Sequence, residues 1–187
     1  AKTPAAIAAW VKALGGKAEL EGGKLHSISL ASTPVSDSHI KVLADATDLV
    51  ELSLAGTEVG DIGVASLKKL VNLKSLNLSA TTVSDRGLEQ LTGMKKLETL
   101  VLEATLIRGT GFGHLKGLTA LRNLNLTSLP LRDAAISSLA DAIAHVEVLS
   151  LAYAEPTNAS MKDLARLTAL KSLDLTGTDV GDAGLVE

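Results

Sequence analysis

A pattern of apolar positions recurs along this chain from residue 25 onward. Its clearest copy is residues 73–96, with the sequence LKSLNLSATTVSDRGLEQLTGMKK. In the first half of this copy apolar and polar residues alternate, as they do in a strand with one buried face. In the second half Leu88, Leu91 and Met94 recur every three residues, on one face of a helix. Each copy therefore predicts a short strand followed by a short helix.

Copies of this pattern follow one another at a nearly constant spacing. We number them repeats 1 to 7; they begin at Leu25, Leu49, Leu73, Leu97, Leu121, Val146 and Leu170. The spacing is 24 residues, except for the 25 residues that separate the starts of repeats 5 and 6. One strand and one helix cannot bury their own apolar sides, so successive repeats must stack.

Stacking would place the strands about 4.8 Å apart in a parallel sheet. Because helices are wider than strands, a stack with helices on one side bends toward the sheet. We therefore predict the α/β class and a solenoid of about seven repeats of 24 residues. It is a right-handed arc, with the parallel sheet on its concave face and the helices on its convex face.

The first 24 residues do not follow the repeat and predict a separate N-terminal cap. Thr3 and Pro4 are typical of a helix start, and Gly15-Gly16 of a helix end. Residues 18–20 predict a short strand that turns at residues 22–23 into the first repeat. The first repeat would otherwise expose its apolar side, and we expect Trp10 to anchor the cap. Two parts are thus predicted: a helical cap over residues 1–24, and one continuous domain of repeats over residues 25–187, with the last repeat incomplete.

The last residues, 182–187, fall inside the seventh predicted helix and no polar cap follows them. Three interpretations stay open. The sequence is part of a longer protein, or it has a short natural terminus, or another chain covers this end.

The repeat has the form LxxLxLxxTxV followed by [S/G]DxGLxxL. This motif resembles the leucine-rich repeats of many bacterial proteins, which are similar to the ribonuclease-inhibitor-like class. The resemblance covers roughly residues 25–187 and is far more specific for fold than for function. It implies recognition of a protein partner through the concave face or its rims, and no catalysis in the repeats.

Composition narrows the possible partners. The net charge of −3 and the absence of clustered basic residues disfavour binding to nucleic acid. No apolar stretch approaches the length of about 20 residues that a membrane-spanning helix needs. The chain has no cysteine, which excludes disulfides and thiol chemistry but does not indicate a compartment.

Two columns of polar residues recur with the repeat. The first holds Asp37, Asp61, Asp85, Asp133 and Asp182, and the second holds Thr33, Thr57, Thr81, Thr105 and Thr178. We expect each aspartate to accept hydrogen bonds from the first-turn amides of its own helix. A calcium ladder is the alternative for this column. We expect each threonine to bind loop backbone groups of the next repeat.

A third column consists of charges that alternate in sign, at Lys74, Glu98, Arg122, Glu147 and Lys171. Side chains at this spacing would pair across neighbouring strands. The alternative is that this column of charges forms a surface that recognises a partner electrostatically. Because neighbouring charges of opposite sign neutralise one another, this alternative is the weaker one.

No motif indicates an enzyme, a cofactor or a bound metal. The histidines occupy different phases of the repeat, at His26, His39, His114 and His145, and cannot meet at one centre without breaking the repeat geometry. Nothing resembles a nucleophile with its base, or paired carboxylates in a cleft.

Repeats 4 to 6 depart most from the rule and contain the candidate partner-binding residues. These are Val101, Glu103, Leu106, Leu129, Pro130, Val148, Tyr153 and Glu155. Departures from a strong repeat often mark functional sites, and neutral drift in a tolerant loop is the alternative. We predict a protein-interaction scaffold. The alternative function is a structural solenoid that self-associates through its C-terminal end, with a homodimer that a charge at Leu185 would disrupt.

Overall fold

The strands form a single ordered sheet. The computed structural model describes residues 2–186, and within them the sheet has eight strands in chain order. They are β1 (Lys17–Glu21), β2 (Lys24–Ser29), β3 (Glu51–Ser53), β4 (Ser75–Asn77), β5 (Thr99–Val101), β6 (Asn123–Asn125), β7 (Val148–Ser150) and β8 (Ser172–Asp174). Strands β2 to β8 are parallel, whereas β1 pairs antiparallel with β2. This open parallel sheet confirms the predicted solenoid.

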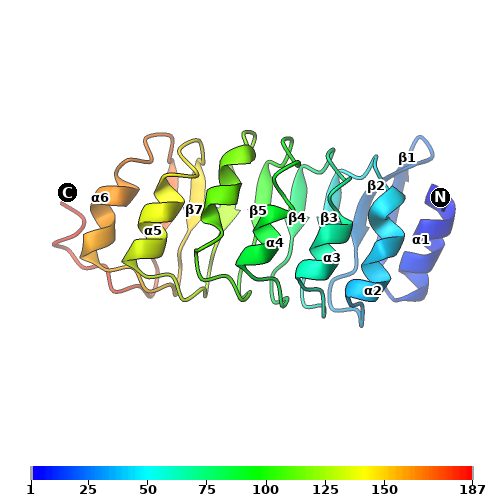
Figure 1. Cartoon of the computed structure of the whole chain (residues 1–187), viewed down its shortest axis with the longest axis horizontal. Coiled ribbons are helices and arrows are strands. Elements are labelled where there is room, and N and C mark those ends of the chain that lie inside the picture. Colours follow the sequence, from blue (N-terminus) through cyan, green and yellow to red (C-terminus); the bar gives the residue numbers. More distant parts are fainter. Residues whose placement is uncertain (1, 187) are drawn as a thin grey trace.

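The helices all lie along one side of the sheet, and the chain ends lie at opposite ends of the long axis (Figure 1). The α-helices are α1 (Pro4–Ala13), α2 (Asp37–Ile40), α3 (Asp61–Ser66), α4 (Asp85–Glu89), α5 (Asp133–Ala140) and α6 (Met161–Leu164). Three 3-10 helices accompany them, η1 (Lys41–Asp45), η2 (Phe112–Gly117) and η3 (Asn158–Ser160). No helix of residues 2–186 covers the other side of the sheet, which we call the sheet face.

Leucine ladders between the sheet and the helices form the core. Leu52, Leu76, Leu100 and Leu124 are paired in register on neighbouring strands, and each is at most 2% exposed. Apolar side chains on the helices, such as Leu88, complete this core and recur at the spacing predicted from the sequence. In the last repeat, the equivalent Leu173 and Leu175 are only partly buried.

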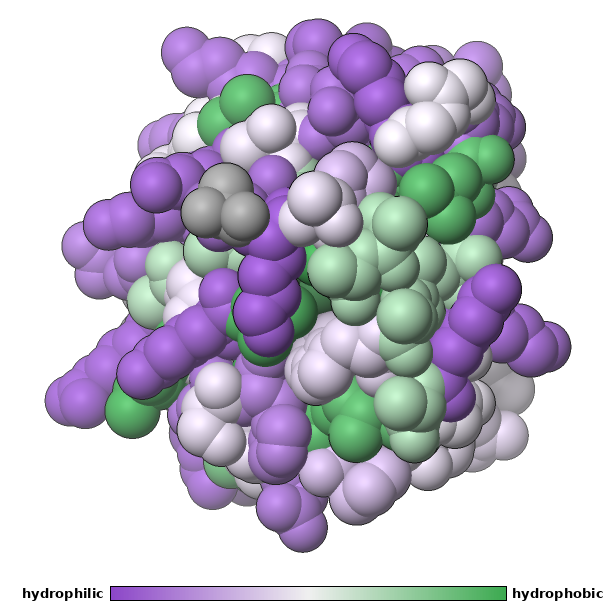
Figure 2. Space-filling view, turned by 90° about the vertical axis from the view of Figure 1, so that its right-hand side faces the viewer, coloured by the Kyte–Doolittle hydropathy of each residue, from purple (hydrophilic) through white to green (hydrophobic). Residues whose placement is uncertain are grey.

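The N-terminal helix α1 and strand β1 cover the first repeat, and both elements were predicted from the sequence. Thr3 caps α1, since its Oγ1 accepts a hydrogen bond from the Ala6 amide at 3.2 Å, and Pro4 begins the helix. Ile7 and Val11 are buried against the core, and Trp10 packs beside them, partly buried. Figure 2 views this end, where apolar surface lies among hydrophilic side chains. The division of the chain at residue 24 stays a prediction.

The aspartates do not cap their own helices, so that prediction is wrong. Ser84 is the N-cap of α4, and Asp85 is its first helical residue. The Asp85 carboxylate instead accepts hydrogen bonds from amides of the next repeat, from Arg108 at 2.9 Å, Gly109 at 3.0 Å and Gly111 at 2.8 Å. Asp37, Asp61 and Asp133 reach forward in the same way. These aspartates therefore tie repeats 1, 2, 3 and 5 to their successors.

The threonines act within their own repeat, which also differs from the prediction. Thr81 Oγ1 donates to the Leu78 carbonyl at 2.6 Å, three residues earlier. Thr33, Thr57, Thr105 and Thr178 do the same. Each hydroxyl closes the turn after its strand, and the buried oxygen is satisfied locally.

The alternating charges pair along one edge of the sheet. Lys74 lies 3.0 Å from Glu98, and Glu147 lies between Arg122 at 3.7 Å and Lys171 at 2.6 Å. The Arg122 guanidinium also donates to two nearby backbone carbonyls, those of Thr119 and Leu121. Hydrogen bonding to Lys171 lowers the pKa of Glu147. These pairs are solvent-exposed, so each contributes little to stability.

Candidate functional site

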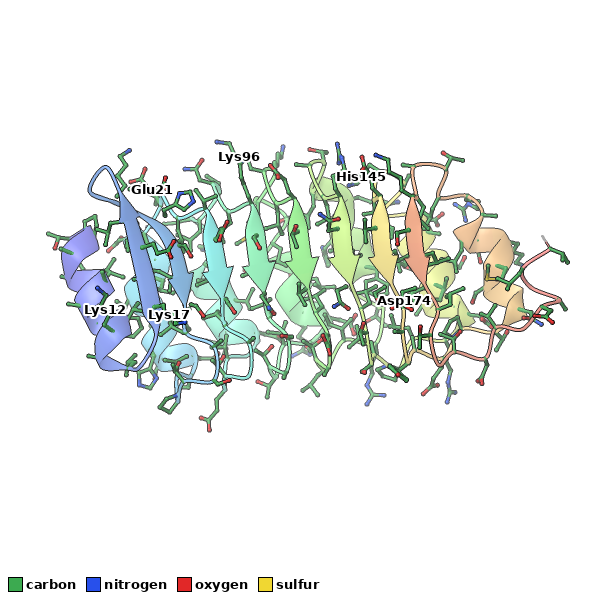
Figure 3. The ribbon with its side chains drawn as sticks, turned by 180° about the vertical axis from the view of Figure 1, so that it is seen from behind. Lys12, Lys17, Glu21, Lys96, His145 and Asp174 are labelled. Atoms are coloured by element: carbon green, nitrogen blue, oxygen red, sulfur yellow. The ribbon has the colours of Figure 1, made fainter. Side chains whose placement is uncertain are left out.

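Small side chains cover most of the sheet face. The register places two outward-facing residues of each strand in rows that cross the sheet. In repeats 1 to 3 these residues are Ser27, Ser29, Glu51, Ser53, Ser75 and Asn77. In repeats 4 to 7 they are Thr99, Val101, Asn123, Asn125, Val148, Ser150, Ser172 and Asp174. The valines make this second half the more apolar part of the sheet face, which Figure 3 views directly.

A shallow hollow of about 190 Å³ lies over β5, β6 and β7. Val101 and Val148 flank it, and Val148 is 41% exposed. Its lining also includes Asn125, which accepts the Thr127 amide at 2.9 Å, and Ser150, which meets the Thr127 hydroxyl at 2.9 Å. The hollow thus combines apolar walls with polar groups that are held in place by hydrogen bonds.

The loops after the strands form the neighbouring edge of the surface, which we call the loop edge. Leu106, Pro130 and Glu155 occupy equivalent places in repeats 4, 5 and 6, and Leu106 is 58% exposed. The Leu106 amide donates to Val83 at 2.9 Å, and the Glu155 amide donates to Leu131 at 3.1 Å. The loops of repeats 4 and 6 are therefore fixed by the preceding repeat, whereas Pro130 has no amide to make this bond.

Tyr153 stands at the loop edge in an unusual backbone conformation. Its φ is +57°, in the left-handed region, and the residue is 64% exposed. The equivalent positions also have positive φ, and they hold small residues: Ser32, Gly56, Ala80, Ala104, Ser128 and Gly177. A Cβ on Gly177 would lie 2.5 Å from Tyr153 Cδ1, so the ring lies directly over this glycine. An aromatic side chain therefore occupies a position at which the other repeats have a small residue or glycine.

Acidic groups surround this part of the surface. Glu155 accepts a hydrogen bond from Arg132 Nε at 2.9 Å, which raises the pKa of Arg132. Asp174 accepts the Thr176 amide at 2.9 Å and the Ser150 hydroxyl at 3.4 Å. Hydrogen bonding to Thr176 lowers the pKa of Asp174, so its carboxylate is charged at neutral pH.

Among the predicted residues, Leu129 lies apart from the rest. It is 1% exposed and takes the buried position that threonine holds in other repeats, as the 4% exposed Ala154 does in repeat 6. It therefore belongs to the core beneath the loop edge. Glu103 is half-buried beside the sheet face, and Val101, Leu106, Pro130, Val148, Tyr153 and Glu155 all reach the surface.

Sequence reasoning missed Asn123, Asn125 and Asp174. The two asparagines look like ordinary repeat residues, but the register places them between the valines of the hollow. Asp174 could have been noticed in the sequence, because it places a charge at the repeat position that Ser53, Asn77 and Ser150 hold in other repeats.

The histidines do not meet. His26 Nδ1 lies 3.2 Å from Glu21, His39 Nδ1 lies 3.1 Å from the Ser36 amide, and His145 Nε2 lies 2.8 Å from the Leu118 carbonyl. Over residues 2–186, no three side chains of His, Asp or Glu gather as metal ligands would. In the same range, no helix has both the length and the apolar character needed to cross a bilayer.

Comparison with known proteins gives two findings. A family model described as a leucine-rich repeat matches residues 69–91 and 167–187. Among solved structures, an internalin from Listeria monocytogenes is similar, with a TM-score of 0.61 and 20% identity over 85% of this chain. The match spans 50% of that internalin chain, so this chain covers half of its length. No curated protein matches the sequence.

Proposed function

Because this chain is a leucine-rich repeat protein, a class whose members are generally protein-interaction scaffolds, we propose that it binds another protein through repeats 4 to 6. The proposed surface joins the hollow to the loop edge. We call it the recognition surface, and it consists of Val101, Glu103, Leu106, Pro130, Val148, Tyr153 and Glu155. Leu129 supports it from within the core.

The placement of Tyr153 supports this proposal most directly. A non-glycine residue in the left-handed region costs about 1–2 kcal/mol, and a small residue or glycine would fold as well there. Tyrosine is enriched among residues that dominate binding energy at protein interfaces. The residue is 64% exposed, so burial within this chain does not account for it.

The hollow gives the surface a second anchor point. Repeats 1 to 3 offer serine, asparagine and a glutamate on the sheet face, whereas Val101 and Val148 lie on either side of β6. An apolar side chain of a partner would be removed from water there, the main source of affinity at interface centres. Proteins of this class are typically non-enzymatic, and we propose no catalysis, cofactor, nucleic acid or membrane partner for this chain.

Paired substitutions at one row of the sheet face test the proposal. Val148→Gln fills the hollow with a neutral polar side chain, and Ser75→Gln makes a similar change at the matching place in repeat 3. Proteins retained from an extract by the immobilised chain should be lost with Val148→Gln and kept with Ser75→Gln. Retention that is equal on both variants would overturn the proposal.

Self-association through the last repeat is the second candidate. Leu173 and Leu175 are only partly buried there, and Leu185 is 63% exposed. A second copy could cover these side chains and the free edge of β8. Light scattering should then show a mass that rises with concentration, and Leu185→Asp should abolish the rise. A monomer at every concentration would exclude this role for the chain.

A further inference from the structure

The recognition surface is bordered by acidic side chains on its repeat 6 and 7 side, whereas Arg108 and Arg132 lie at the loop edge in repeats 4 and 5. The surface's own Glu103 and Glu155 are joined in repeat 7 by Asp174 and Asp179. Residues 172–186 contain no lysine or arginine. Arg132 lies beside these acids and is already paired with Glu155. The surface around Tyr153 is therefore negative.

Hydrogen bonds fix one acid close to the tyrosine. The Tyr153 amide donates to the Thr176 carbonyl at 2.7 Å, and the Thr176 amide donates to Asp174 Oδ1 at 2.9 Å. Tyr153 and Asp174 are thus held by two groups of one residue. Asp174 is exposed on the sheet face, where Figure 3 labels it at the carboxyl end of β8.

A second acid lies on the other side of the tyrosine. Glu155 follows two residues later along the loop edge, and a parallel bridge sets Asp179 beside Thr157. The aromatic ring therefore has a carboxylate toward the sheet face and carboxylates toward the loop edge. A cation attracted to the face of a tyrosine ring gains further from carboxylates nearby.

The hollow is continuous with this acidic region. Ser150 lines the hollow, and its hydroxyl donates to Asp174 Oδ2 at 3.4 Å. The middle of the hollow lies over β6, two strands from β8, and thus about 10 Å from Asp174. An extended peptide covers that distance in about three residues.

We propose that the partner protein presents a lysine or arginine that lies on the ring of Tyr153 and pairs with Asp174. An apolar side chain about three residues away enters the hollow between Val101 and Val148. This inference rests on the proposed function, and it adds the chemistry of the partner: a basic segment with an apolar anchor.

Random 12-residue peptides displayed on phage, selected on the full chain, are the probe. The selected peptides should be enriched in lysine or arginine placed three positions from an apolar residue. Their affinity should fall at least tenfold with Asp174→Asn and with Tyr153→Gly, and should weaken as salt is raised. Asparagine can still accept the Thr176 amide, so the melting temperature of Asp174→Asn should match that of the wild type. Asp48→Asn, at an exposed acid paired with Lys24, is the control and should bind normally.

The single tyrosine gives a direct readout, because fluorotyrosine labelling yields one ¹⁹F resonance. A selected peptide should shift this resonance, and the same peptide with glutamine in place of the basic residue should not. Peptides that lose binding on Val148→Gln but show no basic enrichment and tolerate Asp174→Asn would overturn the basic-partner inference alone. Peptides indifferent to Val148→Gln would overturn the recognition surface itself, and the inference with it.

Discussion

At the scale of single residues, Tyr153 is a side chain that the turn itself does not require and that is exposed to solvent. The loop after each strand turns through a residue with positive φ, and small residues satisfy that turn elsewhere. Gly177 leaves room for the tyrosine ring, because a Cβ there would overlap it. Two neighbouring positions are therefore adapted to one exposed side chain.

Replacing Tyr153 with glycine should leave the fold intact and remove binding. Glycine relieves the left-handed strain but gains entropy in the unfolded chain, so these effects nearly cancel. The free energy of unfolding, measured by urea denaturation, should change by less than about 1 kcal/mol. Ala104→Gly, the same change of backbone in repeat 4, is the control and should retain both stability and binding. A large loss of stability in Tyr153→Gly would show that the ring serves the fold.

Asp133 should give the fold a dependence on acid pH. Hydrogen bonds from Ser160 first, and then from the Thr157 amide, lower its pKa below the usual 3.8. A carboxylate whose pKa is lower in the folded state stabilises above its unfolded pKa, and this stability is lost as pH falls through the folded value. Thermal melting below about pH 4 should therefore decline more steeply for the wild type than for Asp133→Asn. Parallel curves would contradict this role of Asp133.

At the scale of elements, the forward-reaching aspartates explain the glycine in the repeat motif. A Cβ on Gly63 would lie 2.5 Å from Asp37 Oδ1, and one on Gly87 would lie 2.8 Å from Asp61 Oδ1. Repeat 4 has Gly109 in place of the aspartate, and the following repeat then has Ala135 in place of the glycine. The glycine thus accompanies the carboxylate of the preceding repeat in repeats 2 to 4, whereas in repeat 6 Ser160 takes this position and its hydroxyl donates to Asp133.

The sequence predicts the elements better than the bonds between them. Period-2 and helical spacing give the strands and helices, and the constant repeat length gives the register. The same spacing leaves open which amides an aspartate binds, because its own helix and the next repeat both offer free N–H groups. In repeat 4 the helix is the 3-10 helix η2, and residues 108–111 before it lack the usual aspartate. The apolar periodicity does not distinguish this 3-10 helix from an α-helix.

Loss of Asp85 should destabilise the chain far more than loss of Asp182. Asp85→Ala leaves three amides of repeat 4 without their acceptor, at a cost of at least about 1–3 kcal/mol. Within residues 2–186 no amide donates to the Asp182 carboxylate, and only its backbone carbonyl accepts one, from Leu185, so Asp182→Ala should cost under about 0.5 kcal/mol. Chemical denaturation of both variants measures the difference. Equal costs would favour capping of the aspartate's own helix.

At the scale of the whole molecule, the register assembles the site from distant residues. Val101 and Val148 lie two repeats apart along the chain, and their positions in the repeat are enough to predict that both face outward. Leu129 shows where this reasoning fails. A departure from the threonine column marks the position as different, but only the packing shows that a leucine fills the buried space of the threonine.

Protection of backbone amides should vary along the solenoid. Leu100 and Leu124 are buried between neighbours on both sides, whereas Leu173 is partly exposed on the edge strand β8. Regions with fewer buried apolar contacts open at lower free energy. Hydrogen exchange should therefore be faster for amides of β8 than for those of β5. Equal protection across the sheet would indicate that β8 is covered, as self-association predicts.

The link from each aspartate to the following repeat also governs how such a chain can change in length. Removal of residues 49–72 would bring Asp37 against the amide of Ser84 and beside Gly87, the same partners that Asp61 has now. Every excision or duplication of a full repeat with this acid and glycine rebuilds the junction, wherever in the repeat the cut falls. Recombination between such repeats can therefore lengthen or shorten the protein without requiring a new set of contacts between neighbouring repeats.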